Sequence, residues 1–353
     1  MPEPAVGDRT DPASPIGEFD PAALERFARR HLAKPHGAFR IERVPGGQSN
    51  PTFFVTLGDR RMVLRKKPAG NTLPSAHAVD REHRVLLALG ATDAPVPRAI
   101  VYSDDLSVVG TPFYLMERLE GRVFHNTALP GVSREHRTAM IFAMAETLAK
   151  LHDIEPALFG LGDFGPPTGY FLRPIQRWTR QYELARWRDL PDVETLIDWL
   201  PRHTPADEAA RICHGDFRLG NLLFHPTEPQ IVGVLDWELS TLGHPLADLA
   251  FSALPWITGP DEYGGFRGLD LAALGIPACD VYLERYYASR KSAKERPLAP
   301  FHTVFALFRM AVIFEGIAAR ARSGNVAAEN AAEVGELSRV FARRAVECLS
   351  GAI

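Results

Sequence analysis

Residues 214–221 read HGDFRLGN, and residues 231–238 read IVGVLDWE. These stretches place an aspartate, Asp216, five residues before Asn221, and a second aspartate, Asp236, at the end of a predicted strand. Phosphoryl transfer from a nucleotide needs a carboxylate that orients the acceptor hydroxyl and oxygen ligands that hold Mg²⁺ against the phosphates. The spacing therefore indicates Asp216 as a catalytic residue, and Asn221 and Asp236 as metal ligands.

The segments on either side of this loop predict two lobes. The first is a small antiparallel sheet with one helix, and the second is larger and mostly helical, so the fold class is α+β. Strands are predicted at 39–44, 52–57, 61–65, 100–102 and 113–118, with helices at 21–32 and 76–89. Later helices are predicted at 135–152, 176–187, 193–200, 279–287, 301–321 and 327–349, with one hairpin within 212–236. We expect a flexible lead over 1–19, a nucleotide-binding N-lobe over 20–117 and a C-lobe with the catalytic loop and acceptor site over 118–353.

Composition excludes several classes of protein. The 353 residues are 46% hydrophobic with a net charge of −3, which is typical of a globular protein and argues against one that holds nucleic acid by a global basic field. The three cysteines form no C-x-x-C pair, so neither a disulfide scaffold nor a cysteine zinc site is expected. Arg309 and Glu315 interrupt the most apolar stretch, 301–319, which predicts a buried helix. With no export signal recognised, we expect a cytoplasmic protein without a membrane partner.

The motifs resemble those of the aminoglycoside phosphotransferase and choline kinase superfamily. The resemblance is closest to the kinase-like domain of acyl-CoA dehydrogenase family members ten and eleven. It is carried by GGQSNPT at 46–52, VLRKKP at 63–68 and LDWELSTLGHPLADLA at 235–250. It implies a two-lobed protein-kinase-like fold that uses ATP and Mg²⁺, with Asp216 as the catalytic aspartate and Asn221 and Asp236 as the metal ligands.

The first glycine-rich turn is a candidate phosphate loop, because its backbone N–H groups and hydroxyl can contact phosphate oxygens. It comprises Gly46, Gly47, Gln48, Ser49 and Asn50. Alone, such a turn is more often a plain hairpin turn. The resemblance implies a cation on the third strand and an acid on the next helix, and Arg65 and Glu82 occupy those places.

Two lysines follow Arg65, so the register of the phosphate contact is open by one residue. Strand alternation puts Arg65 on the face opposite Met62 and Leu64, which favours Arg65 as the cation. Lys66 and Lys67 are expected to be surface charges.

Residues 114–118 are the predicted hinge that receives adenine. Glu117 lies in this segment, and Met116 and Leu115 are candidate pocket walls, although an ordinary core strand is an equal alternative. Asp248 is expected to brace the catalytic loop without reacting, and His214 is expected to hold that loop's backbone.

A basic segment suggests the acceptor. Residues 170–188 hold five arginines and one acid, and Arg173, Arg177 and Arg180 fall on one helix face beside Trp178. These side chains suit an acceptor with a carboxylate, a phosphate or a CoA moiety, but a solvated basic face or aromatic core packing explains them as well. Pro174 leaves open whether the helix begins before or after Arg173.

The prediction is an ATP- and Mg²⁺-dependent kinase that phosphorylates a hydroxyl of a small, anionic molecule. The resemblance implies a hydroxy acid or hydroxyacyl-CoA. Three alternatives remain: an aminoglycoside kinase, a pseudokinase that binds nucleotide or a protein partner without turnover, and a metal-dependent hydrolase with water as acceptor. The sequence specifies neither ATP over GTP nor the oligomeric state.

Overall fold

The computed structural model describes residues 18–45, 50–70, 78–166, 168–206, 208–291, 297–322 and 331–351. The chain divides into two compact units, Met1–Gly90 with Pro97–Leu119 and Ala91–Val96 with Glu120–Ile353. The division falls two residues beyond the predicted boundary at 117. The segment Ala91–Val96 belongs to the second unit, where the Pro95 carbonyl accepts from the Val234 N–H at 2.7 Å.

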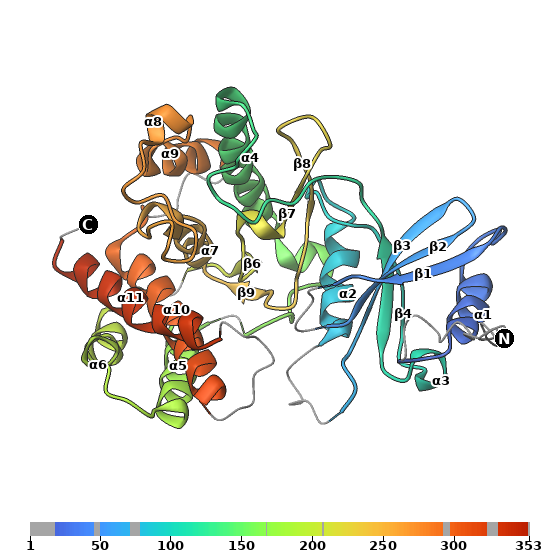
Figure 1. Cartoon of the computed structure of the whole chain (residues 1–353), viewed down its shortest axis with the longest axis horizontal. Coiled ribbons are helices and arrows are strands. Elements are labelled where there is room, and N and C mark those ends of the chain that lie inside the picture. The colour runs from blue at the N-terminus through green and yellow to red at the C-terminus, as the bar shows by residue number, and fades with distance from the viewer. Residues whose placement is uncertain are drawn as a thin grey trace, which may run out of the picture. The chain divides into compact units, whose positions relative to one another are not determined.

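An antiparallel sheet with the strand order β1-β2-β3-β5-β4 forms the first unit (Figure 1). Its strands are β1 (Phe39–Arg43), β2 (Thr52–Leu57), β3 (Arg60–Lys66), β4 (Ala99–Ser103) and β5 (Phe113–Glu117). Its helices are α1 (Pro21–His31), α2 (Val79–Leu89) and a short α3 (Leu106–Val109), which hydrophobic periodicity did not predict. The predicted small antiparallel sheet is confirmed, and the predicted order of strands and helix around α2 is observed.

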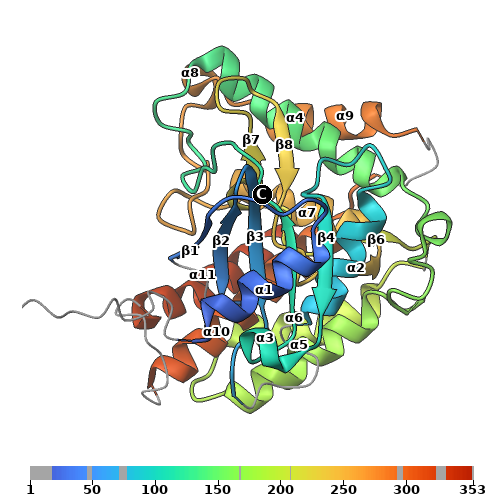
Figure 2. The ribbon, with the colours of Figure 1, turned by 90° about the vertical axis from the view of Figure 1, so that its right-hand side faces the viewer.

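One face of this sheet packs against α1. The helix begins after Asp20, whose carboxylate accepts the Ala22 N–H at 2.9 Å, and it buries Leu24 and Phe27. Side chains from alternate positions of the strands, including Leu64 and Leu115, complete this core. Figure 2 shows α1 lying across the strands, and α2 packs near β4 and β5. Residues that alternate with this core therefore belong to the opposite face.

The second unit is mostly helical, as predicted. Its α-helices are α4 (Arg134–Asp153), α5 (Leu172–Ala185), α6 (Pro191–Trp199), α7 (Pro245–Ser252), α8 (Leu271–Leu274), α9 (Cys279–Ser289), α10 (Pro300–Arg322) and α11 (Ala331–Leu349). Its 3₁₀ helices are η1 (Pro156–Phe159), η2 (Leu200–His203), η3 (Leu219–Asn221) and η4 (Leu254–Trp256). Two strand pairs join them: β7 (Leu222–Phe224) with β8 (Ile231–Val234) is the predicted hairpin, and β6 (Arg211–Cys213) with β9 (Thr241–Gly243) was not predicted.

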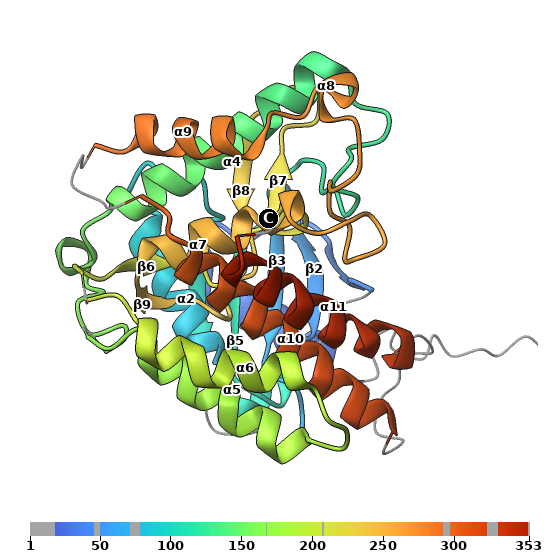
Figure 3. The same cartoon turned by 90° about the vertical axis from the view of Figure 1, so that its left-hand side faces the viewer.

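Helix α5 begins four residues before its predicted start. Pro174 lies in its first turn, where the missing N–H removes no helical hydrogen bond, so Arg173 is helical. Helices α5, α6, α10 and α11 pack around one apolar core (Figure 3). In the described parts of the chain, no helix has both the length and the apolar character needed to cross a membrane.

Arg188, in the segment between α5 and α6, is buried against α10. Its guanidinium contacts both carboxylate oxygens of Glu315, at 2.7 to 3.1 Å, and it also pairs with Glu336 of α11. Glu315 is completely buried in α10. The charge of Glu315 is therefore tolerated because Arg188 compensates it.

Replacing Arg188 with Met should lower the free energy of unfolding by about 3–5 kcal/mol, because Glu315 would remain as a buried, uncompensated charge. Urea unfolding measures the change. The matched control is Arg186→Met, which removes exposed ion pairs and should cost less than about 1 kcal/mol. Adding Glu315→Leu to Arg188→Met should restore most of the loss. Equal losses for the two single variants would contradict this account.

Candidate functional site

Glu82 of α2 gathers three side chains on the sheet face opposite α1. The Glu82 carboxylate is completely buried. It accepts the Asn50 amide at 2.6 Å and the Tyr114 hydroxyl at 2.9 Å, and Arg65 Nη1 lies 3.2 Å from its Oε2. The structure therefore brings together three predicted site residues, Asn50, Arg65 and Glu82. The sequence predicts Tyr114 only as part of the hinge strand. In the structure Tyr114 lies directly opposite Arg65 in the β3–β5 register, and this pairing could have predicted its contact with Glu82.

The Asn50 amide nitrogen is directed at Glu82, so Asn50 helps to fix the acid that orients Arg65. This contact gives Asn50 a bracing role in addition to its predicted place in a phosphate loop. The other members of that loop, Gly46, Gly47, Gln48 and Ser49, lie outside the described residues.

The prediction that Lys66 is a surface charge is wrong. Its side chain is 2% exposed, with Nζ 3.5 Å from Glu18 and 5.2 Å from the centre of the Phe19 ring. Burial lowers the pKa of Lys66, although the Glu18 carboxylate opposes this change. Because side chains alternate along β3, Lys66 lies on the α1 face and Arg65 on the Glu82 face. Lys67 is half-buried.

The predicted hinge strand also divides between the two faces. Leu115 packs in the core beneath α1, so of the two candidate pocket walls only Met116 shares a face with Tyr114. The Glu117 carboxylate lies 4.0 Å from Arg98, and its backbone N–H donates to the Arg98 carbonyl at 2.9 Å. The role of Glu117 at adenine remains a prediction.

In the second unit, Asp248 of α7 holds the catalytic loop by its backbone. The two oxygens of its buried carboxylate accept the N–H groups of His214, at 2.5 Å, and Gly215, at 2.9 Å. Gly215 has φ +83, and a Cβ there would lie 2.6 Å from the Leu239 carbonyl, so only glycine fits. The His214 ring lies 2.8 Å from the Leu235 carbonyl. These contacts agree with the bracing roles expected of Asp248 and His214.

Hydrogen bonds and nearby charges favour the ionised form of Asp248. Burial raises the pKa of this carboxyl, but hydrogen bonding and charge interactions with His152, His214 and Gly215 outweigh burial, so the net shift is downward. His152 Nε2 lies 3.6 Å from the Asp248 carboxylate, and its other ring nitrogen is hydrogen-bonded to the Tyr286 hydroxyl at 2.7 Å. Burial lowers the pKa of His152. Asp248 can therefore serve as an ionised acceptor for the loop.

Asp216 and Asn221 are in direct contact. The Asn221 amide nitrogen lies 2.7 Å from the Asp216 carboxylate and 2.9 Å from its carbonyl, and Arg218 Nε lies 3.2 Å from the same carboxylate. The Asn221 carbonyl accepts the Leu235 N–H at 2.8 Å, which ties the loop to the segment that carries Asp236. Thus Asn221 contacts Asp216 and also the residue that directly precedes Asp236.

Asp236 has φ +63, a conformation that costs energy for any residue with a side chain. Such strain is common where a side chain must be aimed at a ligand. Since the Asn221 nitrogen is directed at Asp216, its Oδ1 remains the atom for a cation, and carboxylate and amide oxygens are the donors that Mg²⁺ prefers. The residues therefore fit the implied ion.

Another cluster with metal-ligand side chains comprises His152, Cys213 and Asp248, whose ligand atoms lie within 4.8 Å of one another. Both oxygens of Asp248 already accept backbone N–H groups, and His152 Nδ1 bonds Tyr286. This set of contacts explains the cluster as the brace of the catalytic loop, without a metal ion.

An apolar cavity of about 300 Å³ lies beside the catalytic loop. Arg218, Leu219 and Gly220 form one part of its wall. Aromatic and aliphatic side chains form most of the rest, including Trp256, Tyr263, Phe266, Met310 and Phe341. None of the described residues that line it is acidic. The sequence patterns do not predict this cavity, although Arg218 lies between Asp216 and Asn221, which they do indicate.

The four predicted acceptor residues do not line this cavity. Arg173 donates to the carbonyls of Thr168 and Pro166, so its guanidinium is used by the preceding loop. Arg177 stacks 4.9 Å from the half-buried Trp178 ring, and Arg180 is exposed. Burial lowers the pKa of Arg177, and Arg309 of α10 adds to this shift. Their role toward an acceptor remains a prediction.

Arg218 is the positive group of the cavity. Burial lowers the pKa of its guanidinium, but Asp216, Tyr263 and Asp236 together outweigh this effect and raise it. Of these groups, Asp216 is in direct contact with Arg218, at 3.2 Å.

The chain is similar to known phosphotransferases. A model of the phosphotransferase enzyme family matches residues 40–296. Acyl-CoA dehydrogenase family member 10 of Mus musculus is 39% identical over 327 residues, which cover 92% of this chain and 30% of that protein. The chain thus spans less than a third of the length of this relative.

Solved structures agree with the fold. A Ralstonia eutropha protein, provisionally assigned as an aminoglycoside phosphotransferase, has a TM-score of 0.86 and 40% identity, covering 94% of this chain and 99% of its own. A mutant of aminoglycoside phosphotransferase APH(4)-Ia, in a ternary complex with ADP and hygromycin B, has a TM-score of 0.59 and 14% identity, covering 91% and 98%. The latter similarity supports the kinase-like fold alone.

We expect Asp248→Asn to displace the catalytic loop, because an amide would turn a donor toward one of the two backbone N–H groups. Turnover should fall at least tenfold, and the free energy of unfolding should fall by about 1–3 kcal/mol. Steady-state kinetics and urea unfolding measure the two effects. Asp198→Asn, on the exposed surface of α6, is the matched control and should change neither. Wild-type turnover in Asp248→Asn would rule out the bracing role.

Proposed function

The chain belongs to the phosphotransferase enzyme family, and from this premise we propose that it transfers the γ-phosphate of ATP to a hydroxyl of a small acceptor with an apolar body and an anionic group. A hydroxy acid or its CoA ester has this chemistry. The relative's name, which refers to acyl-CoA, supports the same class of acceptor.

The roles of the residues follow from their chemistry. Asp216 orients the acceptor hydroxyl and takes its proton as the acceptor oxygen bonds to the γ-phosphorus and ADP leaves. Asn221 and Asp236 would hold Mg²⁺, which would supply positive charge to neutralise the phosphates. Arg65, fixed by Glu82, contributes a cation for the phosphates. The contacts of Asp216 with Asn221 and Arg218 support this assignment.

The observation that carries the acceptor class is the cavity beside Arg218. Among the described residues, its lining is predominantly apolar and contains no carboxylate, whereas a polycationic aminoglycoside would require acidic partners. An acyl chain can occupy the apolar part while Arg218 attracts an anionic end. The cavity therefore favours an acyl acceptor over an antibiotic of the hygromycin type.

The pseudokinase alternative requires loss of a catalytic or metal-binding group. Asp216, Asn221 and Asp236 are all present, and the contacts of Asp216 with Asn221 are intact. A hydrolase would release phosphate without an added alcohol, which provides a direct way to separate it from a kinase.

The proposal is tested by incubating the protein with ATP and Mg²⁺ and following acceptor phosphorylation by ³¹P NMR. The acceptors are hydroxy acids of four to ten carbons, their CoA thioesters, choline, kanamycin and hygromycin B. Phosphorylation of the acyl compounds is expected. Preferential phosphorylation of the aminoglycosides, or phosphate release in the absence of any alcohol, would refute the acceptor class.

A substitution at Asp216 tests its role as the catalytic residue. Asp216→Asn should lower kcat by about 10²–10⁴ because the acceptor proton loses its carboxylate, while the Kd for ATP stays within about threefold. Kinetics and calorimetric titration measure the two quantities. Asp59→Asn, at an exposed turn, is the control and should keep wild-type turnover. Undiminished turnover of Asp216→Asn would reject the role.

A further inference from the structure

Residues 258–267 form a compact loop at the cavity. The Thr258 carbonyl accepts the Arg267 N–H at 2.9 Å, so the ends of the loop meet. Within it, the Gly259 carbonyl accepts two N–H groups, from Glu262 and Gly265. Four members of this loop line the cavity, namely Thr258, Tyr263, Gly264 and Phe266. The loop is therefore a fixed part of the cavity wall.

Tyr263 is held in an unfavourable conformation within this loop. Its φ is +73, which is an outlier for an aromatic residue, and the residue as a whole is 49% exposed. The ring packs edge-on against Phe314, with centroids 5.3 Å apart. Strained residues of this kind persist where the surrounding contacts impose them, and they are frequent at ligand clamps. An exposed, strained tyrosine at a cavity wall is therefore a candidate for ligand recognition.

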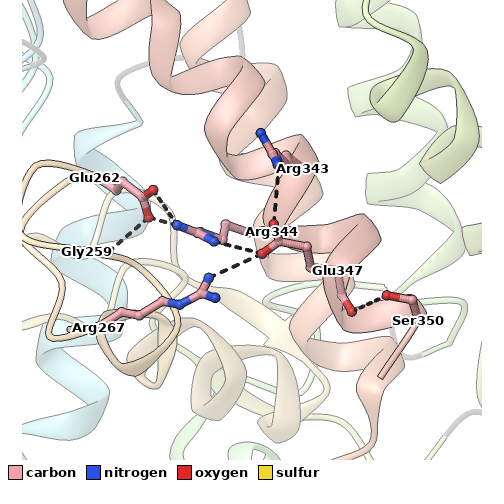
Figure 4. Close-up of polar contacts among 7 residues, drawn as sticks. All are labelled: Gly259, Glu262, Arg267, Arg343, Arg344, Glu347 and Ser350. Atoms are coloured by element: carbon pink, nitrogen blue, oxygen red, sulfur yellow. Dashed lines mark hydrogen bonds and ion pairs between the residues drawn. The ribbon is translucent and has the colours of Figure 1, made fainter. Parts of the chain in front are cut away.

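Ion pairs tie the loop to α11 (Figure 4). Glu262 receives two contacts from Arg344, at 3.0 Å and 2.5 Å, and also accepts the Gly259 N–H at 3.0 Å. Glu347 accepts from Arg344 at 2.8 Å and from Arg267 at 3.2 Å. We call the Glu262–Arg344 pair the latch. Glu262 of the latch directly precedes Tyr263, so the latch fixes the backbone that carries the tyrosine.

Tyr263 and Arg218 line the same cavity. Arg218 in turn contacts Asp216. Arg218 and Tyr263 thus offer hydrogen-bond donors to a ligand in a mostly apolar cavity. If the carbonyl oxygen of an acyl acceptor bound these groups, a hydroxyl group further along the same acyl chain would be directed toward Asp216.

We propose that Tyr263 is a specificity-determining residue: its hydroxyl, together with Arg218, binds the carbonyl end of an acyl acceptor whose chain lies in the cavity, and the latch holds it in position. This inference rests on the proposed function. The carbonyl end is a carboxylate or a thioester, and the two sources are compared in the experiment.

The test compares three acceptors of equal chain length: a hydroxy acid, its CoA thioester and a diol without a carbonyl. Tyr263→Phe should raise KM for the carbonyl-bearing acceptors about tenfold, because one hydrogen bond to a charged or polar oxygen is lost. The KM for the diol, the KM for ATP and kcat should each stay within about twofold of the wild-type values. A larger effect on the acid than on the thioester identifies the carboxylate as the recognised group, and the reverse identifies the thioester.

The latch is tested with Arg344→Met, which changes no cavity-lining residue. We expect KM for the carbonyl-bearing acceptors to rise about threefold to tenfold at constant kcat. Arg339→Met, on the exposed surface of the same helix, is the control and should stay within about twofold. Thermal unfolding followed by circular dichroism verifies that each variant is folded. If Arg344→Met does not fold, Tyr263→Phe alone tests the proposal.

Calorimetric binding of the three acceptors separates the inference from the proposed function. If the wild type phosphorylates the acids but Tyr263→Phe changes all three acceptors equally, or none, the inference is overturned and the function stands. If carbonyl-bearing acceptors bind in a Tyr263-dependent way but are not phosphorylated, the function fails and the inference stands. If the wild type neither binds nor phosphorylates any of them, both are overturned.

Discussion

The catalytic loop depends on one buried carboxylate. Asp248 accepts the N–H groups of His214 and Gly215, and this pair of hydrogen bonds fixes the backbone from which Asp216 projects. The cost of burying a charge is offset because hydrogen-bonding partners surround it. Asn221 and the segment that carries Asp236 then attach to the same loop. The position of each predicted chemical group in the second unit therefore follows from the position of this acid.

The first unit uses the same principle with different partners. Glu82 is buried on α2, and Asn50, Arg65 and Tyr114 of the sheet converge on it. Each unit thus contains a buried acid that converts flexible side chains or backbone into a fixed array. Preorganised groups of this kind stabilise developing charge without rearranging during reaction. The rigidity that the chemistry requires comes from a few desolvated carboxylates.

Local patterns predicted the sheet, most helices and the catalytic loop, because strand alternation, helix periodicity and motif spacing are properties of neighbouring residues. The Asp216–Asn221 contact could be inferred since the two residues share one loop. The burial of Lys66 could not, because it depends on Glu18, which is far away in sequence. The cavity was missed for the same reason: its walls come from segments as distant as Arg218 and Phe341. The basic stripe on α5 drew attention by composition, although Arg173 is already bonded to its own loop.

The burial of Lys66 has a kinetic consequence. Reagents that acylate amines attack only an accessible, uncharged nitrogen, and the Lys66 ammonium is enclosed beside Glu18 and Phe19. Its modification must therefore wait until this side of the sheet opens, whereas the half-buried Lys67 offers a neighbouring reference amine. The ratio of the two labelling rates consequently reports how often the core beneath α1 is exposed to solvent. The two adjacent lysines therefore provide a measure of local unfolding with an internal reference.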